Sequence, residues 1–237
     1  MSIEKSAHPR VVSAADWLDA RKELLAREKE ATRARDALNA SRRRLPMTKM
    51  EKDYRFMGLR GEVGFPALFA GRHQLIIYHF MFDPRWDDGC QTCSRYVDSL
   101  GDLNELHGRD ATFALVSRAP YAKIADYQAR RGWNVPWYSS YGSDFNYDFH
   151  VTFDESIAPT VHNYRSVAIP ADEQPGEGQG LSVFFRLDDA VFHTYSTYGR
   201  GVEGLNNIVN LLDVTPYGRQ EAWEDSPPGW PQHPTYG

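Results

Sequence analysis

The sequence has very little cysteine: Cys90 and Cys93 are the only two in 237 residues. Small disulfide-stapled secreted domains need several pairs, so this count excludes that class of fold. Long hydrophobic runs are also missing, because the most apolar stretch, residues 75–82, is interrupted by His79 and followed by Asp83. No segment therefore predicts a membrane-spanning helix.

The amino-terminal residues and the net charge exclude further classes. Residues 1–10 contain no apolar core of the kind that a secretory signal needs. The formal net charge is -5, which argues against a general nucleic-acid binder and against attraction to anionic membranes. We therefore expect a cytoplasmic protein with no nucleic-acid and no membrane partner. In that reducing compartment, two closely spaced cysteines are expected to be catalytic or metal-binding rather than a stabilising disulfide.

What the sequence does have is a C-x-x-C motif placed directly after the apolar run. The residues beyond it predict a helix from about Cys90 to Leu106. Free N–H groups and the positive end of the dipole at a helix start favour a thiolate, so Cys90 is expected to be nucleophilic near neutral pH. Cys93 lies one turn further on, within reach of a mixed disulfide. Thioredoxin-like proteins build a redox site from this combination of strand, loop and helix start.

Predicted strands and helices alternate around the motif. We expect strands over 74–82 and 111–117, a helix over 121–131, an extended piece over 135–140, a loop over 175–180, a hairpin over 181–195 and a last helix over about 202–212. The first two strands are almost continuously apolar, as are strands buried on both faces of a parallel sheet. The order predicts an α/β sheet with right-handed crossovers.

The chain divides into three predicted parts: a helical extension over 1–46, a globular domain over 47–214 and an irregular tail over 215–237. A helix is expected from near Ser13 towards Arg44. Its apolar seam is thin because charged residues occupy the companion heptad positions, so a self-sufficient coiled coil is not expected. This helix and the aromatic-rich tail are hard to bury on one small domain, and we therefore expect a homodimer.

Several short segments share a resemblance to one family. They are Glu51-Lys52-Asp53-Tyr54, Tyr78-His79-Phe80-Met81-Phe82, Ser117-Arg118-Ala119-Pro120, Gly132-Trp133, Pro136-Trp137, Ser139-Ser140, Asp144-Phe145-Asn146-Tyr147-Asp148-Phe149 and Thr194-Tyr195-Ser196. Over about residues 49–237 the chain resembles a bacterial thioredoxin-like family of unknown function (domain of unknown function 899), which is labelled as related to dithiol-disulfide isomerases. The resemblance implies a thioredoxin-like α/β fold, with a central sheet of the peroxiredoxin and thiol-reductase type flanked by helices. It also implies redox activity, but supplies no substrate.

Two features of better-known relatives are absent from the sequence. Peroxiredoxins have a threonine or serine three positions before the attacking cysteine and a proline seven before it, where this chain has Asp87 and Asp83. A hydroperoxide site of that construction is therefore excluded. Thioredoxins place a cis-proline just before the strand that faces the motif, where this chain has Gly180 and Leu181. That difference puts the usual backbone cradle for an extended peptide in doubt.

The leading interpretation of the motif is thiol-disulfide exchange with a protein or a small disulfide. Cys90 attacks as a thiolate, Cys93 resolves the mixed disulfide, and Trp86 and Pro84 shape access. Electrons come from another dithiol protein, with no bound cofactor. Charged neighbours are expected to act on the thiolate in both directions, carboxylates opposing it and guanidinium groups favouring it: Asp87 and Asp88 against Arg85 or Arg95.

Two other interpretations of the cysteines stay open. A metal site would need two more ligands, which would have to be histidines converging from separate segments. The candidates are His73, His79, His107, His150 and His193. In the structural alternative, the cysteines are buried thiols or a disulfide in a non-catalytic protein that binds a ligand or partner. Our prediction includes no metal.

Further candidate substrate-binding residues follow the other expected strands. Arg118 and Pro120 come where a strand ends beside the motif, and Arg118 is predicted to bind an anionic group or to favour the thiolate, with an ordinary ion pair as the alternative. Trp137, Ser139 and Ser140 follow another strand at the same edge and are predicted to line a pocket, although aromatic core residues would give the same pattern. His79, inside the first strand, is expected to be a hydrogen-bonded core histidine.

Overall fold

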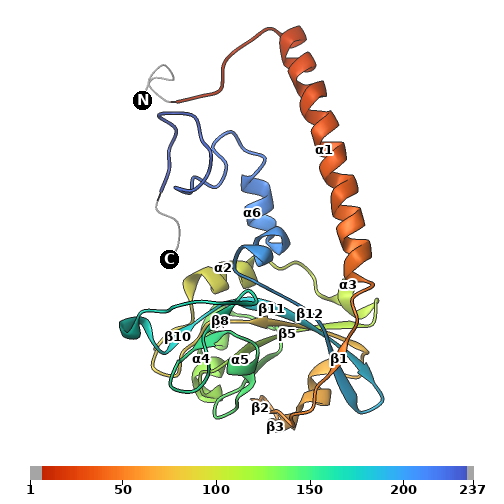
Figure 1. Cartoon of the computed structure of the whole chain (residues 1–237), viewed down its shortest axis with the longest axis vertical. Helices are drawn as coiled ribbons and strands as arrows, with labels where there is room; N and C mark the ends of the chain where they lie inside the picture. Colours follow the sequence, from red (N-terminus) through yellow and green to blue (C-terminus); the bar gives the residue numbers. More distant parts are fainter. Residues whose placement is uncertain (1–6, 234–237) are drawn as a thin grey trace. The chain divides into compact units, whose positions relative to one another are not determined.

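The structure is a computed structural model that describes residues 7–233. Within these residues the main sheet has eight strands in the order β1-β12-β11-β4-β5-β6-β2-β3 (Figure 1). Their bounds are β1 Thr48–Lys49, β2 Arg55–Gly58, β3 Gly61–Gly64, β4 Gln74–His79, β5 Ala111–Ser117, β6 Trp137–Ser139, β11 Gly180–Leu187 and β12 Ala190–Tyr198. Two short ribbons join β7 (Thr152–Phe153) to β10 (Gly176–Glu177) and β8 (Val161–His162) to β9 (Arg165–Ser166).

Strand β4 lies at the centre of the sheet and leads into the cysteine motif. It pairs in parallel with β5, with Ile77 opposite Ala114, and antiparallel with β11, with Ile77 opposite Ser182. β5 continues in parallel to β6, while β11 continues antiparallel to β12. A strand-helix-strand unit beside an antiparallel hairpin, with the C-x-x-C motif after the central strand, is a thioredoxin-like fold, as predicted.

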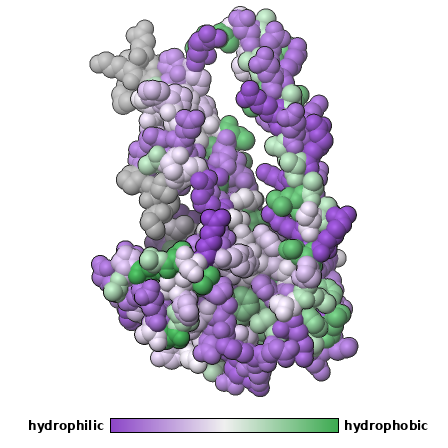
Figure 2. All heavy atoms as spheres, viewed as in Figure 1, coloured by the Kyte–Doolittle hydropathy of each residue, from purple (hydrophilic) through white to green (hydrophobic). Residues whose placement is uncertain are grey.

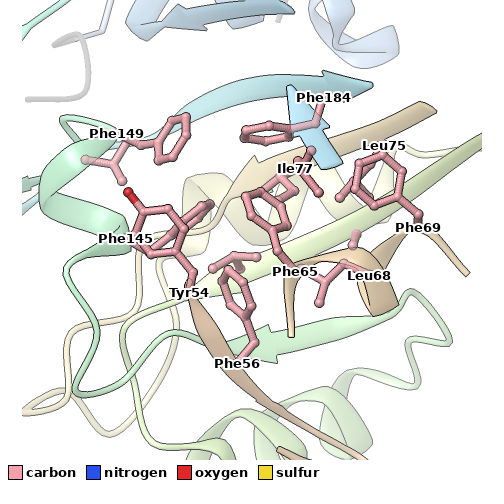
Figure 3. Close-up of a cluster of buried hydrophobic side chains, with 14 of the residues drawn as sticks. Tyr54, Phe56, Phe65, Leu68, Phe69, Leu75, Ile77, Phe145, Phe149 and Phe184 are labelled. Carbon is pink, nitrogen blue, oxygen red and sulfur yellow. The ribbon is translucent and has the colours of Figure 1, made fainter. Parts of the chain in front are cut away.

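The two faces of the sheet bury separate apolar clusters because side chains alternate along each strand. One cluster takes Ile77 and Val116 and is covered by η2 (Phe65–Phe69) and α5 (Phe145–Asp148). Figure 3 shows its rings pointing towards one another between these elements. The other cluster takes Tyr78 and Leu115 and is covered by α2 (Gln91–Asp98) and α4 (Tyr121–Arg131). The cysteine motif belongs to the second face.

Several predicted boundaries need correction. The expected helix to Leu106 is two helices, because the Asp102 carboxylate accepts the Asn104 N–H at 2.9 Å and starts α3 (Asn104–His107) separately. The first strand ends at His79 rather than Phe82. The last helix is a 3₁₀ turn, η4 (Gly199–Leu205), followed by α6 (Asn207–Leu212).

The predicted loop over 175–180 is also wrong in part, because Gly176 and Glu177 form β10 against β7. A Cβ atom at Gly178 would lie 2.9 Å from the Phe153 ring, so glycine is needed where the chain packs on that ring. The sheet itself is mixed rather than parallel, since five of its seven neighbouring pairs are antiparallel.

The chain forms two compact units, one of Pro46–Asn207 and one that joins the stretch up to Leu45 with the stretch from Ile208 onward. In the second unit, α1 (Ala14–Arg42) begins where the Ser13 hydroxyl oxygen accepts the Asp16 N–H, close to the predicted start. None of its residues is buried, and Figure 2 colours most of it hydrophilic. Among the described residues, no helix combines the length and apolar character needed to cross a bilayer.

Phe145 lies within the cluster of Figure 3, and its loss should destabilise the sheet. Its ring lies 4.6 Å from that of Phe149 and 4.9 Å from that of Phe56, and its side chain is fully buried. We expect Phe145→Ala to lower the free energy of unfolding by about 3–5 kcal/mol. Urea unfolding followed by circular dichroism measures this, with the exposed Tyr141→Ala as the control that should change it by less than about 0.5 kcal/mol. Equal losses in the two variants would contradict the assignment.

Candidate active site

The C-x-x-C motif lies where the loop after β4 enters α2. Cys90 is the N-cap of this helix and Cys93 lies in its first turn. The Cys90 N–H donates to the Met81 carbonyl at 3.0 Å, which closes the loop between them. The N–H and the hydroxyl of Ser94 both donate to the Cys90 carbonyl at 2.9 Å. The backbone at the first cysteine is therefore held from both sides.

Gly89 allows the loop to pack closely just before the motif. A Cβ atom at this position would come within 2.6 Å of the Phe80 ring and 3.2 Å of the Tyr127 ring. The Tyr127 hydroxyl is itself hydrogen-bonded to the Ser94 hydroxyl at 2.9 Å. A side chain at position 89 would push the loop away from these rings and move the sulfur that follows.

The two sulfurs differ in exposure and in acidity. Cys90 is partly exposed, whereas Cys93 has an exposed fraction of 0%, and both thiols are free. The Cys93 thiol donates a hydrogen bond to the Cys90 sulfur, and the N–H groups of Cys93 and Thr92 and the Thr92 hydroxyl donate to it as well. These bonds outweigh partial burial and lower the pKa of Cys90 to about 6. Cys90 is therefore mostly thiolate at neutral pH.

Cys93 is held in the opposite protonation state. Burial, together with the hydrogen bond and the negative charge of Cys90, raises the pKa of the Cys93 thiol well above its usual range. The Tyr78 hydroxyl and the Met81 N–H donate to the Cys93 sulfur and partly oppose this rise. One ionised and one protonated sulfur within hydrogen-bond reach is what stepwise disulfide exchange requires.

The charged residues near the motif are paired with one another instead of acting mainly on the sulfur. Asp88 accepts from Arg130 at 2.5 Å, and Arg85 donates to Asp83 at 2.8 Å. The largest influences on the pKa of Cys90 are hydrogen bonds and burial rather than charged side chains. The expected balance between carboxylates and arginines is therefore secondary to the local donors.

Arg118 lies at the carboxyl end of β5 in a buried ion-pair cluster. Its guanidinium donates to Asp83 at 2.6 Å, to Glu177 at 2.7 Å and to the Tyr147 hydroxyl at 3.4 Å. The Asp83 and Glu177 side chains are each 1% exposed. The Thr152 hydroxyl donates to the other Glu177 oxygen at 3.1 Å. The ion-pair alternative for Arg118 is thus present in the structure, and all three guanidinium nitrogens have partners.

The two carboxylates of this cluster differ in charge preference. Burial raises the pKa of Glu177 to about 7, although Arg118 opposes the rise. Burial acts in the same direction on Asp83, but hydrogen bonds from Arg85 and the charge of Arg118 outweigh it and lower its pKa. Asp83 is therefore the permanent counter-ion of Arg118, and Glu177 is the member that titrates near neutral pH.

Pro120 and Trp86 are linked through a lysine. Pro120 is the N-cap of α4, and Lys123 in the first turn of that helix donates to the carbonyls of Pro84 at 2.9 Å and Trp86 at 2.8 Å. The Trp86 side chain is half-buried against the second apolar cluster. Helix α4 thereby holds the loop that carries Cys90.

Trp137 lies in the core, 3% exposed, with its ring 4.5 Å from that of Phe80. Its indole N–H donates to the Ser117 hydroxyl at 2.9 Å. This placement matches the packing alternative given for it. Substrate contacts by Trp86, Arg118, Pro120 and Trp137 stay predictions.

His79 is a buried, hydrogen-bonded histidine. A chain of 2.7 Å contacts runs from its Nε2 through the hydroxyls of Ser182 and Ser196 to Nε2 of His193. Burial lowers the pKa of His79 to about 3, so the imidazole is neutral. Across residues 7–233, no group of three or more histidine, cysteine or acidic side chains is arranged to hold a metal ion.

Sequence reasoning missed three residues that surround the motif. Tyr78 carried a signal, because a tyrosine inside a buried strand needs a partner for its hydroxyl. Glu177 was hidden in a glycine-rich stretch that predicted a loop. Lys123 had no signal at all, since its carbonyl partners lie 37 and 39 positions away.

The family follows from comparison of the whole sequence. The family model described as "Bacterial protein of unknown function (DUF899)" matches residues 6–236. The chain belongs to this family. The match confirms the resemblance carried by the short segments, and it adds no activity. Among curated proteins, none matches the DUF899 chain significantly.

Solved structures similar to the DUF899 protein include peroxiredoxins. Peroxidoxin BcpB from Mycobacterium tuberculosis is 12% identical, with a TM-score of 0.41 over 60% of this chain and 79% of that one. A cysteine-to-serine mutant of PrxQ from Xylella fastidiosa is 13% identical, with a TM-score of 0.45 over 70% and 94%. A cysteine-to-serine mutant of peroxiredoxin Q from Xanthomonas campestris is 13% identical, with a TM-score of 0.41 over 70% and 98%. Likeness at this level says nothing of the reaction.

The hydrogen bond between the sulfurs makes a prediction about the acidity of Cys90 in the DUF899 protein. The rate of Cys90 alkylation by iodoacetamide should rise with pH around a midpoint of about 6, as the thiolate forms. Cys93→Ala removes the thiol donor and should move this midpoint up by about 1–2 pH units. Cys93→Ser keeps a donor and should move it less. Mass spectrometry of the alkylated peptide measures the rates, and an unchanged midpoint in Cys93→Ala would contradict the proposed cause.

The ion-pair cluster makes a second prediction, about stability. Arg118→Met leaves two buried carboxylates without their shared partner and should lower the free energy of unfolding by about 3–5 kcal/mol. Arg85→Met leaves the Asp83–Arg118 pair intact and should cost clearly less. Guanidinium chloride unfolding at pH 7.5 compares the two variants. Equal losses would show that Arg118 is not the principal counter-ion.

Proposed function

We propose that this protein is a thiol-disulfide oxidoreductase of the reductase or isomerase type that works in the cytoplasm. The observation that carries the proposal is that the two sulfurs differ in exposure and in pKa. Cys90 is partly exposed with a lowered pKa, and Cys93 is buried, protonated and hydrogen-bonded to it. A structural cysteine pair needs neither the acidity nor the asymmetry.

The reaction proceeds in two exchanges. The Cys90 thiolate attacks a substrate disulfide, forms a mixed disulfide with one half and releases the other half as a thiolate. The Cys93 sulfur then attacks Cys90, closes the intramolecular disulfide and releases the second half, which takes up the proton that Cys93 loses. The substrate gains two electrons and the protein loses two. Another dithiol protein restores the reduced pair, with no bound cofactor.

The acidity of Cys90 favours the isomerase direction. Stabilising the Cys90 thiolate stabilises the reduced form of the protein. The intramolecular disulfide is then a stronger oxidant, and the reduced pair is a weaker reductant. A protein of this kind readily forms a mixed disulfide with a non-native disulfide of the substrate. A substrate thiol also readily displaces Cys90 again, which leaves a rearranged disulfide in the substrate. The substrate class is therefore a disulfide-bearing protein or small molecule, with no nucleic-acid or membrane component. We also propose a homodimer, which a monomeric mass at micromolar concentration would exclude.

The test is turnover of two disulfides with dithiothreitol as electron donor. The wild-type protein should accelerate insulin reduction and recovery of activity from scrambled ribonuclease. Cys90→Ser should abolish both activities because the attacking sulfur is lost. With dithiothreitol left out, Cys93→Ser should keep the attack and accumulate a mixed disulfide, visible as a mass adduct on Cys90.

A non-catalytic ligand- or partner-binding protein with structural cysteines is the alternative. It predicts an ordinary Cys90 pKa and turnover no better than that of Cys90→Ser. Either result in the wild-type protein would replace the oxidoreductase proposal with the binding one.

A further inference from the structure

The second exchange poses a chemical problem, because it needs a nucleophile from a sulfur that has no contact with solvent. Cys93 has an exposed fraction of 0%, and burial is the largest cause of its raised pKa. A thiolate forming at such a site must be stabilised by fixed donors, since water cannot solvate it.

Tyr78 supplies a donor at this point of the fold. It lies on β4 with its side chain on the face covered by α2, is 2% exposed, and its hydroxyl is hydrogen-bonded to the Cys93 thiol. Its ring packs against Tyr96 of α2 with centroids 4.5 Å apart, which fixes the direction of the hydroxyl. The Met81 N–H donates to the same sulfur from the loop.

We propose that the Tyr78 hydroxyl, together with the Met81 N–H, forms a preorganised site for the Cys93 thiolate and thereby controls the resolving step of disulfide exchange. The assignment rests on the proposed oxidoreductase function and identifies Tyr78 as the residue that controls the second exchange, in which Cys93 attacks Cys90.

The protonation states explain why this site acts only after the first attack. While Cys90 is a thiolate, its hydrogen bond and its charge both raise the pKa of Cys93. In the mixed disulfide Cys90 carries no charge, so both effects disappear. Burial then opposes only the two donors, and the pKa of Cys93 falls. Cys93 therefore becomes a nucleophile only after Cys90 has formed the mixed disulfide.

The step balances without a further reactant. The Cys93 thiol loses its proton, its sulfur forms a bond to Cys90, and the bond from Cys90 to the substrate sulfur breaks. The departing thiolate carries the electron pair and takes the proton. Tyr78 donates a hydrogen bond throughout and keeps its own proton, because burial raises the pKa of its hydroxyl well above the usual range.

The groups with the largest effect on the pKa of Tyr78 include no carboxylate and no imidazole. Its titratable neighbours with the largest effect are Cys93, Tyr96 and Cys90, all from α2 or its cap. The principal influences on the pKa of Cys93 include no carboxylate and no imidazole. From α4, Tyr127 belongs to the same apolar cluster, with its hydroxyl bonded to Ser94.

The experiment is stopped-flow reaction of the reduced protein with 5,5′-dithiobis(2-nitrobenzoate). The first thionitrobenzoate ion reports attack by Cys90, and the second reports resolution by Cys93. In Tyr78→Phe we expect an unchanged first phase and a second phase slowed about three- to tenfold at pH 7, since lost thiolate is partly offset by higher nucleophilicity. The midpoint of the second phase should rise by about 1–2 pH units, and above both midpoints the variant should be at least as fast as the wild-type protein.

Tyr96→Phe is the matched control, because it removes a hydroxyl from the ring that packs against Tyr78 without removing a donor to Cys93. It should leave both phases unchanged. A second phase in Tyr78→Phe with wild-type rate and midpoint would overturn the assignment, as would equal slowing in the two variants. Absence of any second release from the wild-type protein would instead overturn the oxidoreductase function, and the Tyr78 assignment with it.

A second variant covers the case in which Tyr78→Phe fails to fold. Incorporating 3-fluorotyrosine at position 78 keeps the ring and the hydroxyl and makes the hydroxyl a stronger donor. The second phase should then be faster than in the wild-type protein below its midpoint, with the midpoint lowered. A slower or unchanged second phase would contradict the proposal.

Discussion

The hydrogen bond from the Cys93 thiol to the Cys90 sulfur is the interaction on which the site depends. It is the first cause of the lowered pKa of Cys90, and it requires Cys93 to stay protonated. Burial between α2 and the sheet enforces that protonation. The low pKa of the partly exposed Cys90 thus depends on core packing, because the contacts that bury Cys93 also keep its thiol protonated as a hydrogen-bond donor to Cys90.

Charges buried elsewhere at this edge fix the loop that delivers the motif. Asp83, Arg118 and Glu177 bring together the end of β4, the end of β5 and the β7–β10 ribbon. Each of these charges would be costly in the interior without its partners. Displacing one segment would therefore leave the charges of the other two unpaired. The β7–β10 ribbon lies outside the main sheet, yet it contributes Glu177 and so takes part in supporting the site.

The sequence predicted what depends on local pattern. The apolar run before Cys90 indicated β4, and the helix start indicated the direction of the Cys90 pKa shift, because both follow from neighbours along the chain. The ion pair of Arg118 could not be decided, since Glu177 is 59 positions away. The same distance effect hid the β10 strand, whose partner lies in β7. Tyr78 stands between these cases: its burial was predictable from the strand, but its partner depended on which face α2 would cover.

Lys123 ties the loop that precedes Cys90 to a second helix, α4, through a single ammonium group. Its Nζ holds two carbonyl anchors of the loop, at Pro84 and Trp86. Acetylation would abolish the charge and leave one N–H, so one anchor at most could remain. Dimethylation would keep the charge but also leave one N–H. Covalent modification of this amine therefore changes the setting of the nucleophile from a different helix, with neither sulfur touched.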